Sequence, residues 1–318
     1  MQSTHRRRRQ QWKNYSVLSM VSCKRSTVLI IVTVTVSLLI AWQSTWFIQF
    51  FIRDVGKHSK KQKVYIVARN RNPTQVMLVM TDNRFSDPNH WIHLSSAINR
   101  AYAENHGYGF YACNTNEKNE CHGHVPAACK LFCVRDALLM LPEVNTVVYL
   151  DSDAIVRNFS QSIDGFVREN APSHGSSYDL VLPTDCSDYQ FNTGLQIWQN
   201  SASARDLLDE WINRTVTNPR YRGHPFEQQA FKDFYNEENS TITDRLISIP
   251  YGPKTWHVGS CKHGDYIAPQ FIAHITGRWP SWRERTMIDT IRSLCPDKYN
   301  FSIPQCEWLV NITSTKTP

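Results

Sequence analysis

A short apolar run that ends in two aspartates limits the possible folds of this chain more than any other segment. It lies within residues 145–158, which read NTVVYLDSDAIVRN. The residues before the aspartates are Val147, Val148, Tyr149 and Leu150, and this β-branched, aromatic and aliphatic composition is typical of a buried strand. The segment therefore predicts a buried strand whose carboxyl end is acidic.

The two aspartates allow two interpretations. Alternation along an extended backbone points Asp151 and Asp153 to the same side. A hard divalent cation takes oxygen ligands and shares its coordination shell with a substrate diphosphate, and open α/β sheets bind ligands outside the carboxyl ends of their strands. The other interpretation is a turn in which Asp and Ser side chains cap the next segment. An Asp-x-Asp motif alone does not decide between them.

Strand and helix patterns alternate along the rest of the chain. Short apolar runs predict further strands at 76–80, 108–112, 179–183, 191–198 and 246–250. Helical spacing of apolar residues predicts helices at 90–104, 130–141, 163–169, 201–216 and 227–235. Gly107 is placed to end the first helix, because glycine readily takes positive φ. The first strand, helix and second strand have the spacing of a βαβ unit, so we predict an α/β fold with a mostly parallel, Rossmann-related sheet flanked by helices.

The amino-terminal part of the chain predicts a membrane anchor. Residues 26–52 carry no charged residue and are long enough for a single transmembrane helix. A cleaved signal peptide fits less well, because the apolar run is too long and no small-residue cleavage site follows it. Basic residues are denser before the span than after it, which places the amino terminus in the cytoplasm. We therefore expect a cytoplasmic tail at 1–25, a transmembrane helix at 26–52, a stem at 53–74 and a luminal domain at 75–318.

The charge of the chain says more about this topology than about partners. The formal net charge is +7, and much of the positive excess lies in the first 63 residues. No basic patch interleaved with aromatic residues follows in the later chain, so the sequence does not predict binding to nucleic acid.

The cysteines agree with a secreted or luminal domain. Of the nine cysteines, Cys23 lies before the span, which leaves an even number, eight, for disulfides in an oxidising compartment. The alternative is a zinc site at Cys129-x-x-x-Cys133 with His122 and His124 nearby, which is weaker because no second ligand pair follows at finger-like spacing. Glycosylation sequons that would lie on the luminal side begin at Asn158, Asn213, Asn239, Asn300 and Asn311.

Seven motifs in a fixed order carry a resemblance to a known family. They are YAENHGY at 102–108, KLFCVRDAL at 130–138, YLDSDAI at 149–155, DC…NTG at 185–194, LLDEW at 207–211, EQQA at 227–230 and HITG at 274–277. This order resembles the glycosyltransferase family that contains fungal α-galactosyl- and α-mannosyltransferases and plant xyloglucan xylosyltransferases. The resemblance covers residues 76–282 and implies a GT-A fold, a nucleotide-sugar donor, a divalent metal, usually manganese, and retention of anomeric configuration.

The resemblance also implies a complete metal site. His274, followed by Gly277, would supply the third ligand beside Asp151 and Asp153, as the family's His-x-x-Gly motif does. From its spacing alone, His274 would be interpreted as a buried, hydrogen-bonded histidine. Imidazole next to carboxylates suits manganese better than calcium.

Other residues would bind the donor. Lys130 and Arg278 are candidates to neutralise the diphosphate. The family commonly has a lysine two residues beyond the glycine of His-x-x-Gly, where this chain has Trp279, so Arg278 or Lys262 would have to replace it. Further donor contacts are expected from Thr81, Asp82, Ser152, Asn192 and Gly194, with Thr81 and Asp82 at the nucleoside. Each of these positions could also be an ordinary cap, turn or surface charge.

The candidate catalytic residues depend on how the anomeric configuration is retained. A covalent route needs a carboxylate nucleophile, for which Glu227 is the candidate, although a charge at the start of a helix is also favoured by the helix dipole. In front-face attack the departing phosphate takes the acceptor proton and Gln228 steadies the oxocarbenium-like state. We prefer the second route. Asp185 lies where the family holds the donor sugar and the acceptor.

The sequence thus predicts a metal-dependent retaining glycosyltransferase in the Golgi membrane, with type II orientation. Its partners would be a UDP- or GDP-sugar, an oligosaccharide or glycoprotein acceptor, and copies of itself or other Golgi transferases in an oligomer. The alternatives are a catalytically silent homologue that binds glycans or organises a transferase complex, and a lectin-like luminal anchor.

Overall fold

The computed structural model describes much of the predicted luminal domain. The described residues are 64–65, 75–87, 89–140, 143–170, 178–185, 190–237, 242–250, 256–258, 271–276, 280–296, 306 and 309. They all belong to one of two compact units, Gln62–Pro318. The predicted transmembrane helix at 26–52 lies outside the described residues, and no helix among those described is long and apolar enough to cross a membrane.

The strand that ends in aspartate lies in the middle of a seven-stranded sheet with the order β1-β3-β2-β4-β7-β6-β8. The strands are β1 (Val64–Tyr65), β2 (Val76–Asp82), β3 (Gly109–Asn114), β4 (Thr146–Asp151), β6 (Leu180–Pro183), β7 (Leu195–Gln199) and β8 (Leu246–Ile249). β2 pairs in parallel with β3 and β4, and β6 pairs in parallel with β8. Only β1 and β7 run antiparallel to their neighbours among these strands, so the predicted mostly parallel sheet is confirmed.

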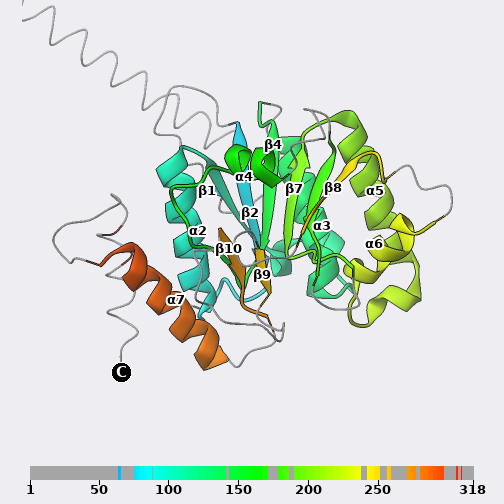
Figure 1. Cartoon of the computed structure of the whole chain (residues 1–318). Helices are drawn as coiled ribbons and strands as arrows, with labels where there is room; N and C mark the ends of the chain where they lie inside the picture. Colours follow the sequence, from blue (N-terminus) through cyan, green and yellow to red (C-terminus); the bar gives the residue numbers. More distant parts are fainter. Residues whose placement is uncertain are drawn as a thin grey trace, which may run out of the picture. The chain divides into compact units, whose positions relative to one another are not determined.

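Both faces of this sheet are buried, as expected for a parallel sheet. Along β2, Leu78 and Met80 pack into one apolar core, whereas Met77 and Val79 pack into the other. The first core includes residues of α2 (Ile92–His106), α4 (Ile163–Asn170) and α7 (Pro280–Leu294). The second includes residues of α3 (Pro126–Met140), α5 (Ala202–Thr217) and α6 (Glu227–Tyr235). Figure 1 shows α2 and α7 on one side of the central strands and α5 and α6 on the other.

Most helix boundaries agree with the sequence signals. Gly107 follows α2 with φ of 69°, and its N–H reaches the carbonyls of Ala103 and Glu104, as the sequence predicts. α3 is the exception, since it begins at Pro126, four residues before the predicted start. Proline favours the first turn of a helix, where its missing N–H costs nothing. Lys130 therefore lies one turn inside α3 rather than at its start.

A second sheet that the sequence did not predict brings a distant segment to the aspartates. It contains β5 (Ala154–Val156), β10 (Ile272–His274) and β9 (Trp256–Val258), in the order β5-β10-β9. β10 runs antiparallel to β5 with His274 opposite Ala154. Three-residue strands are too short to show a periodic pattern, which explains why sequence analysis missed both this sheet and its pairing.

Four of the six described cysteines form disulfides, whereas Cys121 and Cys129 are buried free thiols. Two disulfides are described, Cys113–Cys133 and Cys295–Cys306. The zinc alternative is wrong because Cys133 is already bonded to Cys113. Among the described residues, the group of His, Cys, Asp or Glu side chains that could hold a metal ion is Asp151, Asp153 and His274, which includes no cysteine. Cys186 and Cys261 lie outside the described residues.

Candidate metal site

Two neighbouring backbone segments bring three potential metal ligands together. Asp151 is the last residue of β4, and Asp153 comes just before β5. His274 is the last residue of β10, and the N–H of Ile275 donates to the carbonyl oxygen of Asp153 at 2.8 Å. The pairing of β10 with β5 therefore places the histidine beside the two aspartates, although it lies 121 residues after Asp153 in the chain.

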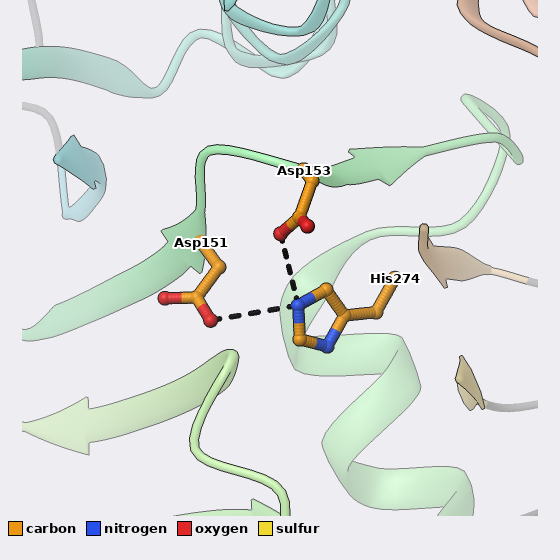
Figure 2. A group of neighbouring side chains, drawn as sticks. All are labelled: Asp151, Asp153 and His274. Atoms are coloured by element: carbon orange, nitrogen blue, oxygen red, sulfur yellow. Dashed lines mark hydrogen bonds and ion pairs between the residues drawn. The ribbon is translucent and has the colours of Figure 1, made fainter. Parts of the chain in front are cut away.

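The three side chains point toward one another (Figure 2). Nε2 of His274 lies 3.0 Å from Oδ1 of Asp153 and 3.5 Å from Oδ2 of Asp151. One ligand atom from each residue lies within 4.8 Å of the others. Two carboxylate oxygens and one imidazole nitrogen at these separations can bind a single divalent cation.

Neighbouring groups bind the other oxygen of each aspartate. Oδ1 of Asp151 accepts hydrogen bonds from Oη of Tyr149 at 2.6 Å and from Nζ of Lys130 at 3.0 Å. Oδ2 of Asp153 is 3.2 Å from Nη2 of Arg283. Each carboxylate thus has one oxygen bound by the protein, and its second oxygen is directed toward Nε2 of the histidine.

The orientation of His274 is fixed in the same way. Oδ1 of Asn192 accepts the backbone N–H of Gly194 at 2.9 Å, while its Nδ2 donates to Asp185 at 2.7 Å. These two contacts identify the amide oxygen, which lies 3.1 Å from Nδ1 of His274. Nδ1 therefore carries a hydrogen and donates it to Asn192. Holding one ring nitrogen of a histidine in this way presents the other nitrogen to a metal.

The charges of the site are set by burial and by neighbouring ions. Burial alone would lower the pKa of His274, but Asp153 and Asp151 outweigh it and raise that pKa to about 9. Burial alone would raise the pKa of Asp151, but Lys130 and His274 lower it below its ordinary value. Asp151 is therefore ionised at neutral pH, and a divalent cation would compete with a proton for Nε2 of His274.

Lys130, which binds Asp151, also forms a buried ion pair with Glu227. Nζ of Lys130 is 2.8 Å from Oε1 of Glu227, the first residue of α6. Oγ1 of Thr193 also donates to this oxygen at 2.7 Å, and the Thr193 N–H donates to Oε1 of Gln228 at 3.2 Å. Glu227 is only 3% exposed. Burial alone would lower the pKa of Lys130, but Asp151 and Glu227 raise it, so the lysine remains a cation that joins α3, β4 and α6.

Replacing Lys130 tests this pair. We expect Lys130→Met to lower the free energy of unfolding by about 3–5 kcal/mol, because two carboxylates would lose their buried counter-ion. Arg220→Met is a matched control, since Arg220 pairs with Asp233 while its own side chain is 66% exposed. That change should cost less than about 1 kcal/mol. Urea unfolding of both variants measures the difference, and equal losses would contradict a structural role for Lys130.

The predicted nucleoside contacts have protein partners. Oγ1 of Thr81 lies 2.9 Å from Oη of Tyr149. Asp82 is buried and forms a two-pronged ion pair with Arg84, with Nε–Oδ1 at 2.7 Å and Nη2–Oδ2 at 2.5 Å. The carbonyl oxygen of Ser152 accepts a hydrogen bond from Ser95 at 2.6 Å. All three residues lie near the aspartates, since Thr81 is paired with Asp151 across β2 and β4.

Three predicted positions, Lys262, Gly277 and Arg278, lie outside the described residues, and two residues of the site were missed. Gly277 and Arg278 belong to the segment 277–279, which the structure does not describe. The sequence did not predict that Tyr149 contacts Asp151 or that Arg283 contacts Asp153 at the candidate site. A basic residue in the first turn of a helix opposes the helix dipole, so Arg283 could have been suspected of having a specific partner if α7 had been predicted.

Comparison with known proteins agrees with the motif order. The model of the galactosyl transferase GMA12/MNN10 family matches residues 71–283, which is more than half of the chain. The chain belongs to this family. Glycosyltransferase 6 of Arabidopsis thaliana is 26% identical over 156 residues, which cover 48% of this chain and 35% of that protein. The match thus spans about a third of the length of this curated relative.

A solved structure shares the fold of this family member. It is a glycosyltransferase involved in the glycosylation of the major capsid of PBCV-1, 19% identical, with a TM-score of 0.55. The alignment covers 68% of this chain and 100% of the other. The likeness shows that the fold, a mixed α/β arrangement with a mostly parallel central sheet, is one that a glycosyltransferase uses.

Proposed function

We propose that this family member is a metal-dependent, retaining glycosyltransferase that transfers galactose, mannose or xylose from a UDP- or GDP-sugar to a glycan acceptor. Membership of a galactosyl transferase family supports the reaction class. The observation that carries the metal dependence is the convergence of Asp151, Asp153 and His274, whose ligand atoms lie within 4.8 Å of one another. Each side chain also has its other polar atom bound by the protein.

The donor set suits manganese or a similar divalent cation. Three ligands that converge from the protein leave further coordination positions for phosphate oxygens. When bound, the cation supplies positive charge that stabilises the diphosphate as it leaves. In this proposal Lys130 keeps Asp151 ionised instead of binding the donor, because its ammonium group is bound by Asp151, Glu227 and Thr193 and lies over the Tyr149 ring. Arg278 is the proposed direct contact to the diphosphate.

The retention of configuration is proposed to use front-face attack. A covalent route needs a carboxylate that can reach the anomeric carbon. Glu227 is almost completely buried and is ion-paired with Lys130, which supports a role in holding the site together. Gln228, its neighbour, is half-buried beside Thr193 and is the proposed residue that steadies the positive charge on the donor sugar. The acceptor proton then passes to the departing phosphate.

Donor hydrolysis tests the function. The purified full chain is incubated with a panel of UDP- and GDP-sugars, with Mn2+ or with a chelator, and release of the nucleoside diphosphate is measured. We expect turnover of a narrow set of donors with Mn2+ and none with the chelator. A folded protein that binds glycans but hydrolyses no donor would contradict the proposal and favour the catalytically silent homologue.

The location is proposed to be the Golgi membrane, with the family domain in the lumen. The two disulfides and the uncharged span at 26–52 with its basic flank support this topology. Luminal proteins meet disulfide-bonded oxidoreductases and oxidised glutathione, which accept two electrons and two protons from a pair of thiols.

A third disulfide is expected in that compartment. Cys121 and Cys129 are buried free thiols, and Sγ of Cys129 donates to the carbonyl oxygen of Cys121 at 3.9 Å. We expect exchange with a luminal disulfide to join the two sulfurs. Tryptic mapping of the protein from a eukaryotic secretory pathway, alkylated without reduction, should recover the peptide 119–130, which carries both cysteines, without alkylation and about 2 Da lighter than its dithiol form. Recovery of both as alkylated free thiols would contradict this expectation.

A further inference from the structure

Arg283 contacts both backbone segments that carry the candidate metal ligands, the one with Asp153 and the one with His274. It lies in the first turn of α7, the helix that follows the His274 segment. Its Nη2 is 3.2 Å from Oδ2 of Asp153, and its Nε donates to the carbonyl oxygen of Ile275 at 3.1 Å. One guanidinium group therefore binds a metal-ligand carboxylate and the residue next to the metal-ligand histidine.

An aromatic ring limits the positions that this guanidinium can take. The central carbon of Arg283 lies 5.2 Å from the centroid of the Trp91 ring, and that of Arg84 lies at the same distance from the same ring. Trp91 is buried at the start of α2. Arg84 is in turn bound by Asp82 through two hydrogen bonds. Cation–π contact with a fixed indole adds a third restraint to Arg283, beside its ion pair with Asp153 and its hydrogen bond to Ile275.

The position of Arg283 in its helix is unfavourable by itself. The first turn of a helix carries partial positive charge, which disfavours a cation by a few tenths of a kcal/mol or more. The contacts with Asp153, Ile275 and Trp91 offset this cost. A planar fork with several N–H donors can bind a carboxylate and a carbonyl together, whereas a lysine ammonium presents a single point charge.

We propose that Arg283 is a positioning residue for the metal site, which rests on the proposed metal-dependent function. By binding Oδ2 of Asp153, it makes this aspartate a one-oxygen ligand whose Oδ1 faces the histidine. By binding the carbonyl of Ile275, it holds β10 and the Asp-Ser-Asp turn at a fixed separation. Arg283 would bind one oxygen of Asp153, as Tyr149 and Lys130 bind one oxygen of Asp151. In this way α7 contributes a residue to the metal site.

Metal titration of the full chain tests the proposal. Arg283→Gln removes the charge and the fork, while Arg283→Lys keeps the charge alone. Arg292→Gln is the matched control, because Arg292 lies on the same helix, is 66% exposed and pairs only three residues away with Asp289. Isothermal titration with Mn2+ should show affinity about 10–100-fold weaker for Arg283→Gln, the range found when groups that orient metal ligands are removed. We expect Arg292→Gln to match wild type and Arg283→Lys to lie between.

Donor hydrolysis separates positioning from a structural role. If Arg283 positions Asp153, a higher Mn2+ concentration restores much of the lost rate, because the defect is in metal occupancy. If Arg283 serves only to hold α7, thermal stability falls while the Mn2+ affinity of the folded protein is unchanged, and the proposal is overturned. Should Arg283→Gln fail to fold, Arg283→Lys decides: weaker Mn2+ affinity supports the proposal, and wild-type affinity overturns it. A wild-type chain that binds no Mn2+ would instead overturn the proposed function itself, and this inference with it.

Discussion

Asp153→Ala is expected to remove Mn2+ binding and to lower donor turnover by at least about 10³-fold. The substitution deletes the oxygen that lies 3.0 Å from Nε2 of His274 and leaves two ligands where three converge. A Lewis-acid cation contributes several kcal/mol to the stabilisation of a leaving diphosphate, and about 4 kcal/mol corresponds to a factor of 10³ in rate. Metal-dependent binding of the nucleotide should disappear together with turnover.

The fold should survive this substitution. The N–H of Ile275 donates to the backbone carbonyl of Asp153, a contact that alanine keeps. Arg283 loses its carboxylate but is partly exposed, so water can hydrate it. Asp164→Ala is a matched control, because Asp164 is an exposed carboxylate in the first turn of α4, the next helix along the chain. Calorimetric Mn2+ titration, thermal unfolding and donor hydrolysis are compared for both variants. Unchanged Mn2+-dependent turnover in Asp153→Ala would refute the metal assignment.

Local patterns in the sequence were sufficient to predict the framework of this site. The apolar run before Asp151 is buried on both faces, so its composition alone identifies a central strand. Gly107 ends α2 in the left-handed conformation that the sequence predicts. The first strand, helix and second strand form a parallel unit, and a short connection of this kind leaves few other topologies. The two aspartates therefore lie, as the sequence predicts, at the carboxyl end of a buried central strand, β4.

Contacts between distant segments could not be predicted from local patterns. His274 was predicted as a candidate ligand only by resemblance, because its position depends on the pairing of two three-residue strands. The pairing of Lys130 with Glu227 depends on how α3 and α6 pack on the second core, and the charges alone gave no indication of it. Asp82 was predicted to contact the nucleoside, which stays a prediction, and its ion pair with Arg84 two residues later was not predicted. A charged residue in the sequence indicates that an ion-pair partner exists, but which residue that partner is depends on the packing of distant segments.

Substitution of Gly194 is expected to have the second large effect on metal binding and turnover, because the neighbours of this glycine leave no room for a side chain. A Cβ atom at this position would lie 2.3 Å from Cε1 of His274 and 2.9 Å from Oδ2 of Asp151. Contacts below 3.0 Å essentially do not occur, so one of the two ligands would have to move. The backbone cannot move away easily, since the Gly194 carbonyl accepts the Asp151 N–H at 2.8 Å and its own N–H is bound by Asn192.

Gly194→Ala is therefore expected to displace His274 while keeping all three ligand residues. We expect Mn2+ affinity and donor turnover to fall by about 10²-fold or more, since a ligand pushed by an ångström no longer reaches the same cation. The free energy of unfolding should fall by about 1–3 kcal/mol, as in other overpacked interiors. Isothermal titration with Mn2+ and thermal unfolding measure the two effects separately.

Gly223→Ala is the matched control for this substitution. A Cβ atom at Gly223 would meet nothing within 4 Å, and its φ of −106° suits any residue, so the variant should bind Mn2+ and turn over donor like wild type. Wild-type Mn2+ affinity in Gly194→Ala would mean that the imidazole has freedom to shift without leaving the metal. In that case the close approach of Gly194 to His274 would not be required for binding, and the Asn-Thr-Gly segment would act only as the entry to β7. A loss in Gly194→Ala alone would show that the absence of a side chain at this glycine, and not only the presence of three ligands, makes the site bind metal.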